Sequence, residues 1–369
     1  MISVSICIPT YNRAAHLANC LQSIIVNKLR SKIEFQVCIS DNCSTDETED
    51  VVRRAQASIA IKYRKNSANL GIPKNFLNVV EMADGEFVWL IGDDDLLLPY
   101  ALAELYDLIK EHQHVDFFYI NSFHLTTQYV SAFPQPFDTV NLPNNMSPVS
   151  SWQNSGEMRF IDLVNPRISF DFLGGMFLSV FRRRNWCQNA DVLDKEAISD
   201  LRTFSQFDNT FPHIKIFAKA FANSKAYFNA KPLSVCLTGA REWAPMYPFV
   251  HSVRLVEALR EYRNNGLPYI KYLQCKNFAL NNFIPDLVKM IINKEQSGYA
   301  YIKPLRLILG NCLYPNFYLS VVNFLLRKIR LILNRPLSIV DSKSNYVSPQ
   351  CTSEDADVVL NKGNRSYGK

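Results

Sequence analysis

The sequence FVWLIGDDD, residues 87–95, is an apolar run of strand length that ends in three consecutive aspartates. A strand here would place carboxylates at its C-terminal end, which is the edge of an open α/β sheet where ligands bind. Adjacent carboxylates repel one another unless a cation neutralises them, and a hard divalent ion that also bridges two phosphates would do so. The alternative is an acidic loop that caps the helix expected near Pro99, since aspartate and proline both favour helix starts.

Strands and helices are expected to alternate on both sides of this run. Apolar segments predict strands at residues 4–9, 35–40, 59–64, 87–92 and 115–121. Helical spacing and start signals, including a capping box formed by Ser44 and Glu47, predict helices at residues 14–26, 48–57, 73–82 and 100–110. The alternation predicts the α/β class, with a Rossmann-like and mostly parallel sheet. The first strand-to-helix turn, PTYNR, lacks the glycine patterns of dinucleotide-binding folds and P-loops.

The second half of the chain is less regular. Residues 126–160 are rich in Pro, Asn, Ser and Gln and are expected to form a long connection. A strand is expected near residues 233–237, and helical spacing returns from residue 251 onward. These features divide the chain into residues 1–125, residues 126–245, a helical extension at residues 246–337 and a disordered tail at residues 338–369.

Composition restricts the class of protein and its partners. The chain has 369 residues, of which 48% are hydrophobic and 20% charged, as in an ordinary folded protein. The net charge of +6 is mild, but residues 296–340 contain no acidic residue and several basic ones, which suggests an anionic partner. Nine cysteines without a C-x-x-C pair predict a reducing compartment, with neither a disulfide framework nor a zinc site. No segment has the apolar length of a bilayer span, so we expect a cytoplasmic protein that can lie on a membrane surface.

Four motifs together give the first third of the chain a family resemblance. They are VSICIPTYNR at residues 4–13, ISDNCSTD at residues 39–46, NLG at residues 69–71 and DGEFVWLIGDDD at residues 84–95. In this order and spacing they resemble family 2 glycosyltransferases with the GT-A fold. Among these enzymes, the motifs are most similar to bacterial abequosyltransferase-type enzymes that build lipopolysaccharide O-antigen. The resemblance implies a nucleotide-sugar-binding half in residues 1–125, an acceptor-binding and catalytic half in residues 126–245, and inversion of the anomeric centre.

The resemblance also implies how the motifs bind a nucleoside diphosphate sugar. The implied contact residues are Pro9, Thr10, Tyr11, Asn12, Asp41, Asn69, Gly71, Asp93 and Asp94. In an extended stretch, residues two apart share a face, so Asp93 and Asp95 are expected to point together. Asp95 is expected to coordinate Mg²⁺ or Mn²⁺ directly, with Asp93 beside it. The ion would stabilise the leaving nucleoside diphosphate as its charge develops.

Such a transfer also needs a base that deprotonates the acceptor hydroxyl. Family members usually carry an acidic residue at the start of a downstream helix, but this chain departs from their common Glu-Asp pair. Asp208 is the preferred candidate and Asp200 the second, with a plain helix cap as the alternative for Asp208. His213 could assist or be structural. Arg241, in a loop after the expected strand, could bind the diphosphate or be an ordinary surface arginine.

The apolar and basic stretch at residues 301–333 leaves two interpretations open. It could form an interfacial helix pair on an anionic membrane, or a helical domain that packs on the core. The first would place the site beside a lipid-linked oligosaccharide at the cytoplasmic face of the inner membrane. No nucleic-acid partner is expected. Two other functions remain open: a nucleotidyltransferase, which would need a glycine-rich basic loop in place of PTYNR, and a membrane-associated sugar-nucleotide-binding protein that lacks a base.

Overall fold

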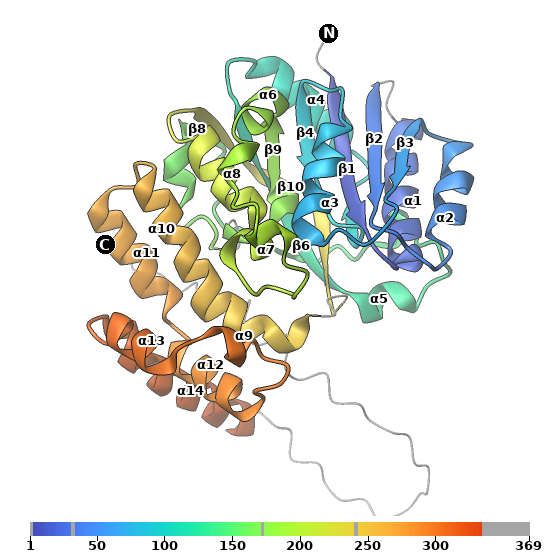
Figure 1. Ribbon diagram of the computed structural model, residues 1–369. Coiled ribbons are helices and arrows are strands. Elements are labelled where there is room, and N and C mark those ends of the chain that lie inside the picture. The colour runs from blue at the N-terminus through green and yellow to red at the C-terminus, as the bar shows by residue number, and fades with distance from the viewer. Residues whose placement is uncertain (1–2, 31–33, 171–172, 240–242, 334–369) are drawn as a thin grey trace, which may run out of the picture.

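A computed structural model describes residues 3–30, 34–170, 173–239 and 243–333 of the protein. It contains one large sheet, with the C-terminal helices gathered on one side of it (Figure 1). The strands are β1 (Val4–Thr10), β2 (Phe35–Asp41), β3 (Ile61–Lys65), β4 (Phe87–Leu90), β5 (Asp95–Leu97), β6 (Phe117–Thr126), β7 (Ser147–Pro148), β8 (Gly156–Arg159), β9 (Ser179–Arg182) and β10 (Lys225–Thr238). They follow the order β3-β2-β1-β4-β9-β6-β10-β5, with β7 paired to β6 and β8 to β10.

The part of the sheet formed by β1 to β4 is parallel, as the alternation of strands and helices predicted. β1 pairs in parallel with β2 and β4, and β2 pairs in parallel with β3. Strand β9 then lies antiparallel between β4 and β6, while β10 is parallel to β6 and antiparallel to β5. Every residue of β1 and β4 is buried, as expected of strands covered on both faces. The predicted α/β class is confirmed, and the sheet is mixed.

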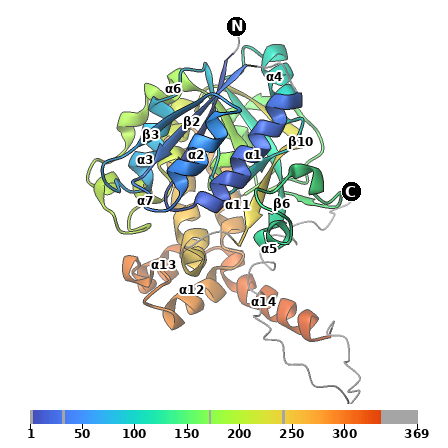
Figure 2. The ribbon, with the colours of Figure 1, turned by 90° about the vertical axis from the view of Figure 1, so that its right-hand side faces the viewer.

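Helices cover both faces of this sheet. The helices of the first part are α1 (Ala14–Arg30), α2 (Thr48–Gln56), α3 (Ile72–Glu81) and α4 (Ala101–Glu111). Helices α1 and α2 lie side by side on one face (Figure 2), and α3 packs on β1 and β2 from the other (Figure 1). The capping box predicted before α2 is not formed. The Ser44 hydroxyl instead accepts a hydrogen bond from the backbone N–H of Asn12, at 2.8 Å, and so ties two strand-end turns together.

The segment predicted as a long connection contains short ordered elements. Helix α5 (Thr127–Ser131) follows β6 directly, and β7 and β8 add to the sheet. The chain then continues through α6 (Arg183–Cys187), α7 (Phe207–Thr210) and α8 (Pro212–Ala220). Helix α8 begins with a proline at its first position, where the missing N–H has no intrahelical partner to lose.

The C-terminal helices extend the same core. They are α9 (Tyr247–Phe249), a π-helical turn (Val250–Arg254), α10 (Leu255–Asn264), α11 (Tyr269–Ala279), α12 (Phe283–Ile292), α13 (Pro304–Asn311) and α14 (Pro315–Leu333). Phe283, Met290 and Phe317 belong to the buried cluster that also contains the sheet. No helix in residues 3–333, so far as they are described, combines the length and hydropathy needed to cross a bilayer. The predicted tail at residues 338–369 lies outside the described residues.

Candidate active site

A pocket of about 870 Å³ lies where β1 and β4 end. It is lined by most of the residues that the sequence predicted, which come from four separate segments. They are Pro9, Thr10, Tyr11, Asn69, Gly71, Asp93, Asp94, Asp95 and Asp200. The register explains why the first and second strands end together, because Thr10 is paired with Asp41 at the last position of both.

The three aspartates lie in a tight turn. The Asp95 N–H donates to the Gly92 carbonyl at 3.2 Å, and the Gly92 N–H donates to Oδ2 of Asp95 at 2.7 Å. A Cβ on Gly92 would lie 2.6 Å from Oδ1 of Asp94, so any larger residue there would force the Asp94 side chain to move. The extended geometry that we expected for Asp93 and Asp95 is therefore wrong, because the backbone reverses between them.

Arg13 supplies the positive charge beside these carboxylates. Its Nε lies 3.2 Å from Oδ1 of Asp93, and its Nη2 lies 3.3 Å from Oδ2 of Asp94. Thr10 donates its hydroxyl to Oδ2 of Asp93 at 2.8 Å. Sequence reasoning did not single out Arg13, although it ends the PTYNR motif. The turn is thus built as a charged cluster, with Asp93 buried and Asp94 partly exposed to the pocket.

Side-chain amides hold the neighbouring rim of the pocket. Asn42 donates to Oδ1 of Asn69 at 2.7 Å and accepts from the Leu70 N–H at 2.8 Å. Asn69 in turn accepts the N–H of Gly71, whose φ of +82° suits glycine. Asn75 donates to the Thr10 carbonyl at 3.3 Å and links this rim to β1. Asn42 and Asn75 also line the pocket, and we did not predict them.

Two predicted contact residues, Asp41 and Asn12, are engaged in hydrogen bonds within the protein. Asp41 is fully buried, and its two oxygens accept hydrogen bonds from the Ser44 N–H at 2.8 Å and the Tyr63 hydroxyl at 2.7 Å. Burial and the Asp41 carboxylate together raise the pKa of Tyr63. Asn12 has a φ of +51° and accepts the Thr45 N–H at 2.8 Å. Neither Asp41 nor Asn12 lines the pocket in this structure, so their predicted ligand contacts stay predictions.

The two candidate bases lie in different surroundings. Asp208 does not line the pocket; its Oδ2 accepts from Lys215 Nζ at 2.8 Å and from the Asp194 N–H at 2.7 Å. Asp200 does line it, with a side chain 14% exposed. Hydrogen bonds from Arg202 and the Ser205 hydroxyl hold the pKa of Asp200 well below its usual range. Asp200 is therefore ionised at neutral pH and faces the pocket.

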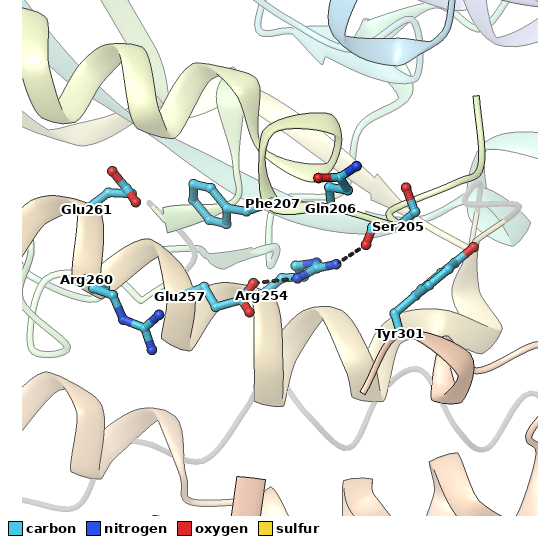
Figure 3. Close-up of a pocket in the computed structure, with 8 residues that line it drawn as sticks. All are labelled: Ser205, Gln206, Phe207, Arg254, Glu257, Arg260, Glu261 and Tyr301. Atoms are coloured by element: carbon cyan, nitrogen blue, oxygen red, sulfur yellow. Dashed lines mark hydrogen bonds and ion pairs between the residues drawn. The ribbon is translucent and has the colours of Figure 1, made fainter. Parts of the chain in front are cut away.

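Arg254 fixes the loop that carries Asp200. Its guanidinium donates to the carbonyls of Phe204, at 2.9 Å, and Ser205, at 2.7 Å, and it pairs with Glu257 on the next helical turn. Figure 3 shows this arginine between Glu257 and Ser205 in a second, smaller pocket of about 350 Å³. Because Arg254 is buried, its contacts brace the Asp200 loop against the C-terminal helices.

Two more features of the pocket had little or no sequence signal. His213 lines it with a ring that is 3% exposed, and neither ring nitrogen has a hydrogen-bond partner among the described residues. Burial lowers the pKa of His213 to about 3, so the ring is neutral. The lining also includes the aromatic residues Trp243, Tyr247 and His251. Arg241 lies outside the described residues, and its predicted diphosphate contact stays a prediction.

Comparisons with known proteins concern the family and the fold of the chain. A family model described as glycosyl transferase family 2 matches residues 5–174. Abequosyltransferase RfbV of Salmonella typhimurium is 29% identical over 248 residues, which cover 63% of this chain and 66% of that protein. The poly(ribitol-phosphate) beta-N-acetylglucosaminyltransferase TarS of Staphylococcus aureus is 32% identical over 113 residues, or 30% of this chain and 20% of that protein. A crystal structure of residues 1–349 of S. aureus TarS in complex with UDP matches with a TM-score of 0.50 at 20% identity, covering 77% of this chain and 72% of that one.

Proposed function

Because the chain belongs to glycosyl transferase family 2 and has the GT-A fold that its sequence predicted, we propose that it moves a sugar from a nucleoside diphosphate sugar to a lipid-linked oligosaccharide of a bacterial surface polysaccharide. One observation carries the proposal. The aspartate turn, the PTYNR turn, the amide-held rim and Asp200 meet in one pocket of about 870 Å³. Small-molecule sites have volumes of roughly 300–1,000 Å³.

We infer that a divalent cation binds at the aspartate turn together with the substrate phosphates, because the described residues contain no group of three or more His, Cys, Asp or Glu side chains that could hold an ion alone. The donors of the turn are carboxylate oxygens, and Mg²⁺ is usually bound by one or two carboxylates together with substrate phosphates. Asp93 and Asp95 would hold Mg²⁺ or Mn²⁺, with Asp94 at the rim. Bound there, the ion would neutralise negative charge on the leaving diphosphate. Arg13 already pairs with Asp93 and Asp94 and neutralises part of their charge. A bound cation would replace Arg13 as the positive partner of these carboxylates.

Asp200 is the base in this proposal. The acceptor hydroxyl oxygen attacks the anomeric carbon, the bond from that carbon to the diphosphate oxygen breaks, and the hydroxyl proton passes to Asp200. The ion pair with Arg202 keeps Asp200 deprotonated before the substrate arrives. Arg202 is largely exposed, so it can move away when the acceptor enters, and the carboxylate then becomes a stronger base.

The C-terminal helices support an anionic membrane as the place of reaction. We define the C-terminal apolar face as the exposed large apolar residues of α13, α14 and their link: Leu305, Leu309, Leu313, Tyr318, Leu319, Val321, Val322, Leu325, Leu326 and Ile329. Exposed basic residues flank it, namely Lys303, Arg306, Lys328 and Arg330. Apolar side chains bordered by cations suit a surface of anionic lipids.

A panel of nucleotide sugars tests the proposed activity. We expect one of them to raise the melting temperature with Mn²⁺, since a ligand at 100 times its Kd stabilises by about 2.7 kcal/mol. Asp95→Asn should remove the Mn²⁺-dependent part of the shift, whereas Asp107→Asn, on the exposed side of α4, should not. Release of the nucleoside diphosphate on addition of acceptor then separates an enzyme from a binding protein. The proposal fails if no nucleotide sugar changes the melting temperature.

A further inference from the structure

Three aromatic side chains form a row along one wall of the pocket. The ring centroids of Trp243 and Tyr247 are 6.5 Å apart with an interplanar angle of 2°, and those of Tyr247 and His251 are 5.9 Å apart at 13°. All three line the pocket and are only partly buried. These nearly parallel rings follow one another in a row and are each partly exposed, so they bring apolar ring surface and polar ring atoms to the pocket.

The backbone beneath the row is unusual. Tyr247 begins α9, and His251 lies in the π-helical turn Val250–Arg254 that follows it. π-Helical turns are rare and are frequently found at functional sites. The same turn ends at Arg254, which braces the Asp200 loop, and the Trp243 ring packs edge-on against Phe204 of that loop at 5.3 Å. The row is therefore connected to the candidate base from two directions.

The end of the row has an oriented hydrogen-bonding group. Nδ1 of His251 lies 3.3 Å from Oδ2 of Asp286, and this carboxylate is itself fixed by the Ser252 hydroxyl at 2.6 Å. Asp286 is buried, so it holds the imidazole in one orientation. Nδ1 faces the carboxylate, which leaves Nε2 as the ring nitrogen that can form a hydrogen bond with a ligand.

We propose that Trp243, Tyr247 and His251 form the subsite that binds the acceptor sugar. Sugar rings have one face of C–H groups that packs flat on aromatic rings, and hydroxyls at their edge that need polar partners. The row offers both, with Nε2 of His251 as hydrogen-bond partner for a hydroxyl. The charged groups that suit a diphosphate lie elsewhere, at the aspartate turn and Arg13. The inference rests on the proposed function, since an acceptor subsite presupposes a transferase.

Saturation-transfer NMR on the full chain tests the subsite without a known acceptor. The probes are methyl glycosides of common bacterial hexoses and 6-deoxyhexoses, and nucleoside diphosphate binding is measured separately by calorimetry. We expect C–H protons of at least one glycoside to receive saturation. Trp243→Ala and Tyr247→Ala should weaken glycoside binding at least about tenfold, as truncation of aromatic anchors does. Nucleoside diphosphate binding should stay within about twofold of wild type, because the proposed diphosphate contacts are made at the aspartate turn and Arg13 rather than by these rings.

Matched variants separate stacking from a loss of folding. Trp243→Phe keeps an aromatic face and should retain glycoside binding, and Trp152→Ala should behave as wild type because this exposed tryptophan is outside the pocket lining. The inference is wrong if Trp243→Ala binds glycosides normally, if no glycoside binds the wild type, or if the donor nucleotide sugar displaces the glycoside. Glycoside binding without any nucleotide binding would instead overturn the proposed function.

Discussion

Nε of Arg13 lies 3.2 Å from Oδ1 of Asp93, across 80 residues of sequence, at the point where β1 and β4 both end. The same guanidinium reaches Asp94, so one cation serves two adjacent carboxylates. This arrangement resolves, within the protein, the repulsion that the sequence presents in three consecutive aspartates. A divalent ion bound at the turn would reduce the same repulsion between carboxylates.

The first prediction concerns Arg13→Ala. Without a divalent ion, we expect the free energy of unfolding to fall by about 1–3 kcal/mol, because buried Asp93 loses its counter-charge while Arg13 itself is partly exposed. Saturating Mn²⁺ should reduce this loss. Urea unfolding with and without MnCl₂ measures both values. Arg159→Ala, which breaks an exposed pair with Asp162, should change the free energy of unfolding little in either condition. An equal loss for Arg13→Ala with and without Mn²⁺ would argue against a metal at this turn.

The second prediction separates Asp200 from Asp208. Asp200→Asn should lower kcat by about 10²–10⁴, the range of general-base catalysis, while nucleotide-sugar binding persists. Asp208→Asn should instead lower the free energy of unfolding, because Lys215 and the Asp194 N–H lose a buried charged partner. Single-turnover rates, together with urea unfolding of both variants, distinguish the two roles. Full turnover in Asp200→Asn would remove Asp200 from the mechanism.

The contrast between these two aspartates shows how far sequence reasoning reaches. Strands β1 to β4 and their helices follow from local apolar patterns, and the ends of parallel strands meet at one edge by geometry, so the aspartate turn could be placed. Both Asp200 and Asp208 are polar residues before or within short helices, and nothing local indicates which carboxylate faces the pocket. That outcome depends on Lys215, one helix further on, and on Arg254 from the C-terminal part.

The remaining misses have the same physical cause. Arg13 and Asp93 pair across β1 and β4, which requires the strand order rather than either motif. The row of Trp243, Tyr247 and His251 depends on a π-helical turn, which apolar periodicity does not predict. The sequence predicts which segments form helices and strands. It does not predict which side chains from distant segments contact one another.

The third prediction is a pH dependence of stability caused by His213. Its pKa is about 3 in the folded state, because burial among Phe76, Phe211 and Phe217 disfavours the charged ring, and near 6.5 when unfolded. As the pH falls, the unfolded state therefore binds the proton first. The contribution of neutral His213 to the free energy of unfolding is complete above pH 6.5 and decreases below it. Between pH 7 and pH 5 the loss is about 2 kcal/mol.

Two variants check this assignment. His213→Phe keeps an aromatic ring of similar size and should remove this part of the slope of unfolding free energy against pH. Tyr262→Phe removes the hydroxyl of another fully buried ring that has no hydrogen-bond partner among the described residues, and should leave the slope unchanged. Chemical denaturation at several pH values gives the slopes. An unchanged slope in His213→Phe would show that another group titrates in this range.

The fourth prediction concerns the C-terminal apolar face. The wild type should co-sediment with vesicles that contain phosphatidylglycerol, more weakly with pure phosphatidylcholine, and less at high salt because the lipid charge is screened. Leu309→Glu combined with Leu313→Glu should weaken binding at least tenfold, since each buried leucine contributes roughly 1.5–3 kcal/mol. Leu29→Glu combined with Val140→Glu introduces the same charge at exposed apolar sites elsewhere and should bind as wild type. If neither vesicle type binds, and size-exclusion chromatography shows a dimer that the Leu309/Leu313 double variant dissociates, this face pairs with a second copy of the chain and not with lipid.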